Sequence, residues 1–405
     1  MWLRETSPSE RHTLLAACLG YGLDGFDFMI YSFIMPTLLA LWHMSKAQAG
    51  YIATGALLTS AVGGWAAGVL ADRYGRVRVL QWTVAWFAAF TALSGFTDSY
   101  PALFFTRALQ GLGFGGEWAV GSILIAETIA ARHRGKAAGL VQSSWAIGWA
   151  AAALAFGGLY ALLPATLAWR VLFWLGVAPA LLIVYVRRRV QESPVYASLR
   201  GRRGETHFLD IFAPPLRRTT LLASLLCTGM LGAYYAVNMW LPTYLSSERH
   251  LSTLGTSRYL LILIAGSFAG YLTSAWLSDA LGRRRCFMLF AAAGAVLVLA
   301  YTRAAVSDVQ MMVLGFPLGF FQSGIFSGMG AYLAELYPSA VRGSGQGFSY
   351  SAGRAASALF PAVIGAASDH VSLAASIGAT TAAGYGLVIV AAWILPETRG
   401  QVLRP

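Results

Sequence analysis

The sequence predicts an all-α polytopic membrane protein with twelve transmembrane helices in two parallel six-helix halves. Of the 405 residues, 57% are hydrophobic and only 11% are charged, with a mean hydropathy of +0.60. A soluble chain carries about 25% charged residues. The charges gather between long apolar blocks, as helical membrane proteins require. Three short sequence marks also recur at nearly one spacing, which indicates an internal repeat.

Each apolar block is long enough for a helix that crosses a bilayer, which needs about 20 residues. The first block exceeds the apolar core of a secretory signal and is followed by no small-residue cleavage pattern, so we interpret it as the first helix of the mature protein. The expected spans are, in order, residues 13–40, 47–70, 79–97, 101–126, 136–163, 168–186, 219–245, 257–279, 286–304, 308–334, 344–366 and 373–395.

The net charge of +12 comes from basic residues that lie mostly between these spans, where they indicate topology. With a cytoplasmic N-terminus, 22 Lys and Arg residues lie on the cytoplasmic side and 5 on the outside. This excess predicts that both termini are cytoplasmic, in a bacterial inner membrane. The basic residues are therefore topology signals, and we expect no nucleic-acid partner.

The repeat divides the chain into two homologous halves. "DRYGRVRVL" and "DALGRRRCF" are 207 residues apart, "ETIAARHRG" and "ELYPSAVRG" are 208 apart, and "MPTLL" and "LPTYL" are 206 apart. The expected domains are an N-terminal half at 1–186, a basic cytoplasmic linker at 187–218 and a C-terminal half at 219–405. Two parallel six-helix halves are typical of transporters whose substrate site lies at the repeat interface near the bilayer midplane.

Four motifs carry a family resemblance over nearly the whole chain. "GVLADRYGRVRVL", from Gly68 to Leu80, resembles the signature loop between helices 2 and 3 of the major facilitator superfamily. "RALQGLG" at Arg107 resembles the helix 4 signature of that family. "QESP" at Gln191 and "PETRG" at Pro396 resemble motifs of its sugar- and organic-ion-porter branches, although the first usually reads "PESP". The resemblance implies a secondary transporter that functions as a monomer.

In that family, charges at the cytoplasmic helix ends hold the halves together and separate as the carrier opens inward. Arg73 and Arg76 of the signature loop can pair with acids or with helix C-terminal carbonyls, whose partial charge is negative. Glu127 with Arg134 offers a similar clasp, and Glu335 with Arg342 repeats it. The alternative is that these charges serve topology only. The residues expected in this conformational gate are Gly68, Asp72, Arg73, Gly75, Arg76, Glu127, Arg134, Asp279, Arg283, Glu335 and Arg342.

Charges deep inside the spans break the repeat. At each corresponding position the other half carries an apolar residue or glycine, so the fold does not demand these charges. A charge there costs about 2.5–3.5 kcal/mol on insertion scales, and it normally faces a cavity or a partner. The alternative for each is a buried structural pair. The unmatched charges are Asp24, Asp27, Arg107, Glu117 and Arg354.

The acids among them suit a proton relay. Asp24 and Asp27 lie three residues apart, so both point to nearly the same face of one helix. Two neighbouring carboxyls resist being charged together, and a low dielectric favours their neutral forms. We expect Asp27 to be the principal proton carrier, followed by Asp24 or Glu117, with Arg107 as the charge partner. Cation binding by these acids is the alternative, but no cluster of further oxygen ligands lies nearby, and we expect no cofactor other than the proton.

Arg354 is the candidate anion clamp, because a guanidinium matches a carboxylate with two parallel hydrogen bonds. It could instead neutralise Glu117 or an aspartate. "LDGFDFMIYSFIMP" and "GFGGEWAVG" resemble motifs of sialate/lactate proton symporters, and the first also resembles aromatic-acid symporters. "GRAASALFP" resembles a helix 11 motif of aromatic-acid and organic-anion carriers.

The resemblance implies proton-coupled uptake of a small organic anion, such as a lactate-like, sialate-like or aromatic acid. A neutral sugar or polyol carrier and an organic-anion exporter remain alternatives. Further cavity candidates lie on helices that line the cavity in this family, although aromatics in membrane helices are often packing or interfacial anchors. The remaining candidates for substrate contact are Tyr31, Trp118, Gln142, Trp145, Tyr234, Tyr235, Asn238, Gln322 and Tyr350.

A membrane enzyme is the competing class. All six histidines fall outside or at the edges of the spans, and no HExxH, GxSxG or paired-cysteine metal motif is present. Nucleophilic and metal chemistry therefore have no evident site, and the sequence predicts no enzyme and no metal centre.

Overall fold

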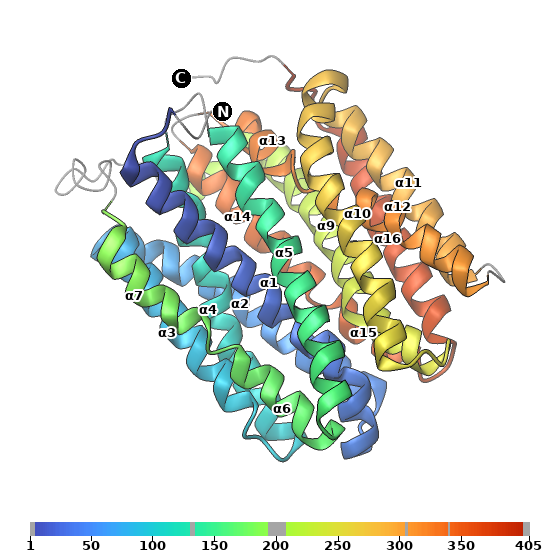
Figure 1. Cartoon of the computed structure of the whole chain (residues 1–405). Coiled ribbons are helices and arrows are strands. Elements are labelled where there is room, and N and C mark those ends of the chain that lie inside the picture. Colours follow the sequence, from blue (N-terminus) through green and yellow to red (C-terminus); the bar gives the residue numbers. More distant parts are fainter. Residues whose placement is uncertain (1–4, 130–133, 193–207, 304–306, 339–340, 400–405) are drawn as a thin grey trace. The chain divides into compact units, whose positions relative to one another are not determined.

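The computed structural model describes residues 5–129, 134–192, 208–303, 307–338 and 341–399 (Figure 1). Within these ranges every regular element is a helix and there is no strand. The chain divides into two compact units, residues 1–203 with 251–257, and residues 204–250 with 258–405. The prediction of an all-α polytopic fold is confirmed.

The first unit contains seven α-helices among its described residues. Three of them are apolar enough over their length to cross a membrane: α1, α2 and the part of α5 from Gly139. The helices are α1 (Pro8–Trp42), α2 (Lys46–Tyr74), α3 (Arg76–Ser94), α4 (Tyr100–Thr128), α5 (Arg134–Leu162), α6 (Ala165–Leu175) and α7 (Pro179–Arg189).

The second unit opens with a short 3₁₀ helix and continues with α-helices. Among the residues described there, five apolar spans are long enough to cross a membrane. One of them, Asp308–Leu336, comprises two consecutive helices. The elements are η3 (Phe208–Phe212), α9 (Pro214–Ser247), α10 (Thr253–Leu281), α11 (Arg283–Arg303), α12 (Asp308–Gly324), α13 (Met329–Leu336), α14 (Arg342–Ser357), α15 (Phe360–Ala367) and α16 (Leu373–Ile394).

Three expected spans each consist of two shorter helices. Residues 168–186 are divided between α6 and α7, and 308–334 between α12 and α13. Residues 344–366 are divided between α14 and α15. Pro179 and Pro361 lie in the first turns of α7 and α15, where the missing proline N–H costs no helical hydrogen bond. An apolar run therefore predicts a membrane crossing without showing whether one helix or two make it.

The internal repeat recurs in the backbone. Gly75 lies between α2 and α3 with φ +99°, and Gly282 lies between α10 and α11 with φ +96°. Residues with a side chain rarely adopt such a backbone conformation, so the turn between the two helices depends on its glycine in each half. Pro36 lies inside α1 and Pro242 inside α9, at corresponding positions. The two halves thus share both their tightest turns and their helix-internal prolines.

Packing within the two units follows the same repeat. In the first unit α1 packs against α5 and α3 against α7, while in the second α9 packs against α14 and α11 against α16. The α1–α5 contact is close because Gly25 and Gly148 lack side chains. A Cβ on Gly25 would lie 2.7 Å from the Trp145 carbonyl oxygen, and one on Gly148 only 1.6 Å from that of Gly22. This contact places the middle of α1, with its acids, deep inside the first unit.

Candidate functional site

Asp27 is the centre of a buried polar cluster in the first unit. Its side chain is fully buried on α1, and that of Arg107 on α4 is 3% exposed. Arg107 Nη1 donates to Asp27 Oδ2 at 3.2 Å, and Gln110 Nε2 donates to the same oxygen at 2.9 Å. One carboxyl group therefore joins α1 and α4.

Aromatic rings enclose the cation of this cluster. The Arg107 guanidinium lies 5.8 Å from the centre of the Tyr31 ring and 5.5 Å from that of the Phe173 ring. Tyr31 donates its hydroxyl hydrogen to the Ala49 carbonyl at 2.8 Å, which fixes its position. Cation–π attraction helps to hold the guanidinium in place, and a dry surrounding strengthens its interaction with Asp27.

Asp24 and Glu117 form a second acidic contact one turn from the first. Asp24 is fully buried and Glu117 is 5% exposed, and the two carboxyl groups interact electrostatically. Two neighbouring carboxyl groups resist being charged together, and a low dielectric favours their neutral forms. The first unit thus holds one carboxyl paired with a cation and one carboxyl paired with another carboxyl.

Trp145 covers the same region of α1 from α5. Its ring lies 5.1 Å from that of Tyr21, 5.7 Å from that of Phe28 and 6.3 Å from that of Phe114, measured between ring centres. Trp145 is 6% exposed, whereas Gln142, one turn earlier, is half-buried. These rings make an apolar surrounding for the acids, in which unpaired charge is expensive.

Arg354 lies in the last turn of α14, 5% exposed, among phenol groups of the second unit. Its Nη2 donates to the hydroxyl oxygen of Tyr350 at 3.2 Å, and its guanidinium carbon lies 5.1 Å from the centre of that ring. Tyr235 on α9 hydrogen-bonds the same guanidinium. The two phenols orient the guanidinium, as a carboxylate clamp requires.

The other predicted contacts of the second unit gather around α9. Gln322 Nε2 donates to Asn238 Oδ1 at 3.2 Å, and the ring centre of Tyr234 lies 5.4 Å from that of Phe326. Asn238 and Gln322 are each 1% exposed.

The gate residues form matched clusters at the turns that contain Gly75 and Gly282. In the first unit Arg76 pairs with Glu127 through Nε–Oε2 and Nη2–Oε1 contacts of 3.1 Å. In the second unit Arg283 Nη2 lies 3.2 Å from Glu335 Oε1. Both glutamates are therefore held by the arginine that follows the turn glycine.

Glu335, which was expected to pair with Arg342, is held by Arg283 in the structure. Arg342 Nε donates to the Ala334 carbonyl oxygen at 3.0 Å. Arg342 is the first residue of α14, and Glu335 lies in the last turn of α13, beside the start of α11. The pairing of Glu127 with Arg134 cannot be described, because the Arg134 side chain lies outside the described part of the structure.

The motifs "QESP" and "PETRG" each contribute a glutamate to these clusters, and the sequence alone suggested no role for either. Glu192 Oε1 accepts from Arg76 N at 3.0 Å, and Glu397 Oε1 accepts from Arg283 N at 2.9 Å. Each carboxylate thus caps the N-terminus of α3 or α11, where the orphan N–H groups and the helix dipole favour negative charge. The repeated spacing of "QES" and "PET" after the two turns was the signal that could have identified them.

Further gate and contact candidates are placed less tightly. Arg73 is exposed and lies 5.2 Å from the centre of the Tyr74 ring. A Cβ on Gly68 would meet no atom within 4 Å, so no close contact explains this glycine. The candidates whose side chains lie outside the described part of the structure are Asp72, Trp118, Arg134 and Asp279.

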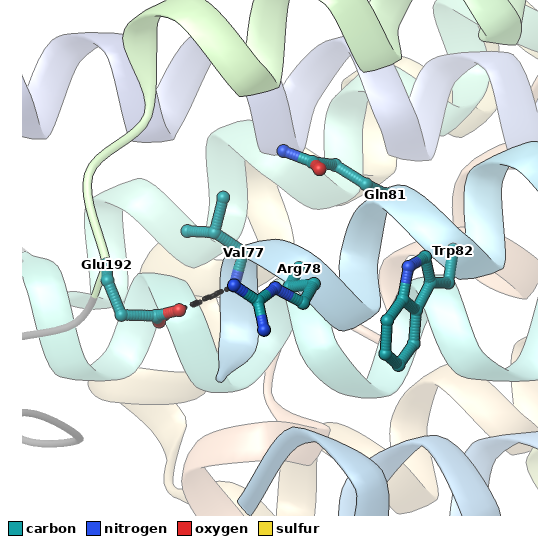
Figure 2. A pocket seen from close by; sticks show the side chains of 5 residues that line it. All are labelled: Val77, Arg78, Gln81, Trp82 and Glu192. Atoms are coloured by element: carbon teal, nitrogen blue, oxygen red, sulfur yellow. Dashed lines mark hydrogen bonds between the residues drawn. The ribbon is translucent and has the colours of Figure 1, made fainter. Parts of the chain in front are cut away.

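A pocket of about 660 Å³ lies at the start of α3, away from the buried charges. Figure 2 shows Glu192 reaching the first turn of this helix, where one of its oxygens accepts from Val77 N at 3.3 Å. Arg78, Gln81 and Trp82 complete the lining. The cap bond occupies Glu192, so the pocket belongs to the turn cluster and does not contain the acids of α1.

Known proteins resemble this chain over most of its length. The sequence model of the Major Facilitator Superfamily matches residues 17–276 and 260–405. A probable 4-methylmuconolactone transporter of Cupriavidus pinatubonensis is 40% identical over 98% of this chain and 93% of its own length. The niacin transporter NiaP of Acinetobacter baylyi is 30% identical over 85% of this chain and 84% of its own length.

Among solved structures, that of the proton:xylose symporter XylE bound to 6-bromo-6-deoxy-D-glucose matches with a TM-score of 0.78. The match covers 98% of each chain at 20% sequence identity. At this identity the likeness shows the fold and nothing about the substrate.

Proposed function

The chain belongs to the Major Facilitator Superfamily, a family of transporters and not of enzymes, and from that membership we propose that it is a proton-coupled symporter of a small organic anion. Uptake proceeds by alternating access across the bacterial inner membrane, with both termini cytoplasmic. The buried Asp27–Arg107 pair carries the proposal, because it joins a proton acceptor to a cation inside the first unit.

Proton coupling follows from what protonation does to this pair. A neutral Asp27 keeps its hydrogen-bond acceptors but loses its Coulombic attraction to Arg107. The guanidinium, which lies near the rings of Tyr31 and Phe173, is then released from its ion pair. The carboxyl contact between Asp24 and Glu117 supplies a second place where a proton can reside. Binding of proton and anion would thus favour one another.

The substrate class is supported by Arg354 and by the relatives. Arg354 is oriented by Tyr350 and Tyr235, and a guanidinium held in this way can bind a carboxylate through two parallel hydrogen bonds. The relatives described above are named as transporters of 4-methylmuconolactone and niacin, both of which are small organic acids. The phenol rings of Tyr350 and Tyr235 beside Arg354 suit an acid with a flat or apolar body.

The test begins with ligand binding by the purified protein. Thermal unfolding in detergent is followed at two pH values with a panel of lactate, sialate, nicotinate, benzoate and 4-methylmuconolactone, and with xylose and glycerol as neutral controls. We expect stabilisation by at least one acid, stronger at the lower pH. Stabilisation by the neutral compounds alone would contradict the anion assignment and favour a sugar or polyol carrier.

Transport is then measured in proteoliposomes with the acid that binds best. An interior made more alkaline than the medium should drive accumulation above the external concentration, and a protonophore should abolish it. Equal uptake with and without the gradient would contradict proton coupling, and net export under the same gradient would favour the exporter.

A further inference from the structure

Two buried amide side chains of the second unit form a chain of hydrogen bonds. Asn238 lies on α9 and Gln322 on α12, and each is 1% exposed. Asn238 Nδ2 donates to the carbonyl oxygen of Tyr234, one turn earlier on α9, at 2.8 Å. Gln322 Nε2 donates in turn to Asn238 Oδ1 at 3.2 Å.

This chain has only one consistent direction. The backbone carbonyl of Tyr234 can only accept, so the nitrogen of the Asn238 amide must face it. The oxygen of Asn238 then faces Gln322 and again can only accept. Gln322 must therefore turn its nitrogen toward Asn238, which leaves its Oε1 as the outer end of the chain.

The outer oxygen has no donor. Among the described residues, none donates a hydrogen bond to Gln322 Oε1, although this atom is buried. Buried carbonyl oxygens in folded proteins nearly always have a donor, so such an atom requires an explanation. A ligand group that donates a hydrogen bond would satisfy this oxygen.

Helix α9 contacts both Arg354 and the side chain that carries this oxygen. Tyr235, which hydrogen-bonds Arg354, and Asn238, which orients Gln322, are three residues apart on that helix. Three residues rise about 4.5 Å, nearly one turn, and lie on nearly one face. The second unit therefore offers a guanidinium and an unpaired acceptor whose partners on α9, Tyr235 and Asn238, lie about one helical turn apart.

We propose that Gln322 Oε1 accepts a hydrogen bond from the transported acid and selects acids that carry a donor group separated from the carboxylate. The inference rests on the proposed function, with Arg354 binding the carboxylate. The ring hydroxyl of 3- or 4-hydroxybenzoate is held away from its carboxylate by the ring and meets this requirement. The hydroxyl of lactate lies on the carbon next to the carboxylate and does not. Asn238 is a positioning residue that acts through Gln322.

The test compares matched acids on matched variants. Affinities of the full-length purified protein for 3-hydroxybenzoate, 4-hydroxybenzoate and benzoate are measured by calorimetry, and lactate and propionate form a second pair. The better hydroxybenzoate should bind about ten-fold more tightly than benzoate, the scale of one hydrogen bond. Lactate and propionate should differ by much less.

The Gln322→Leu variant should bind benzoate as the wild type does and lose the preference for the hydroxybenzoate. Gln322→Met, of similar length, serves if the leucine variant does not fold. Asn238→Ala should weaken the preference without removing benzoate binding. Thr381→Val is the matched control, because Thr381 Oγ1 on α16 is another buried oxygen without a partner among the described residues. Its preference should remain that of the wild type.

Two results would overturn the inference while leaving anion transport intact. One is equal affinity of the wild type for benzoate and both hydroxybenzoates. The other is an equal change in affinity for all three acids on substitution of Gln322, which would mean that water or packing occupies the oxygen. If no acid binds at all while neutral compounds do, the proposed function itself fails, and the selectivity inference fails with it.

Discussion

The energetic coupling between Asp27 and Arg107 yields a quantitative prediction. Asp27 is fully buried, Arg107 is 3% exposed, and their charged atoms lie 3.2 Å apart. Asp27→Asn removes the negative charge with little change in shape and leaves a buried guanidinium uncompensated. Breaking a buried pair in this way costs about 3–5 kcal/mol. Part of that cost should be recovered here, because the asparagine oxygen can still accept from Gln110.

The double variant separates pairing from simple loss of polarity. Arg107→Gln alone should destabilise by a similar amount, since it leaves the carboxylate unpaired. When Asp27→Asn and Arg107→Gln are combined, no buried charge remains. The loss should then be smaller than the sum of the two single losses, by about 1–3 kcal/mol. The free energies of unfolding are measured in mixed detergent micelles from tryptophan fluorescence.

Transport by the same variants adds a functional readout. Asp27→Asn and the double variant should fold, bind the acid and lose its accumulation against a gradient. Additive losses of stability would refute the claim that the pair is energetically coupled. Normal proton-driven accumulation by Asp27→Asn would refute its role as principal proton carrier.

Three further predictions concern the second unit. Arg354→Lys keeps the charge but loses the planar fork, so affinity for the acid should fall about 10- to 100-fold in calorimetry; unchanged affinity would mean that Arg354 only balances charge. Gly282→Ala should destabilise by about 1–3 kcal/mol, because φ is +96° and the new Cβ would lie 2.7 Å from Glu397 Oε2. Gly386→Ala is the control, because its new Cβ would meet no atom within 4 Å. If both variants lowered the unfolding temperature equally, backbone strain at Gly282 would be contradicted. Glu335→Gln should lower the free energy of unfolding by about 1–3 kcal/mol through its lost ion pair, and an unchanged unfolding temperature would contradict this.

The sequence predicts the fold well because its signals are local and repeated. Apolar length locates the helices, and the repeated turns with Gly75 and Gly282 define the two halves before any contact is known. What it does not show is where a span divides. The breaks between α6 and α7 and between α12 and α13 depend on packing, since an apolar run of the same length often continues as one helix.

The candidate site is predictable in its charges but not in its contacts. Lack of a counterpart in the other half singles out Asp27 and Arg107, and the structure brings the two side chains together. Gln110, one turn after Arg107, donates to the same carboxyl, yet it carries no charge that would draw attention to it. The hydrogen bond from Arg354 to Tyr235 likewise depends on how α9 and α14 pack, which no local pattern encodes.

Proton movement that accompanies the acid tests the central claim most directly. Proteoliposomes with a pH-sensitive dye inside and no imposed pH gradient receive the acid that binds best. We expect the lumen to acidify in step with uptake, faster than in protein-free liposomes, which report passive entry of the neutral acid. Asp27→Asn should show only the passive rate. Protein-dependent uptake of the acid without matching acidification would contradict proton-coupled symport.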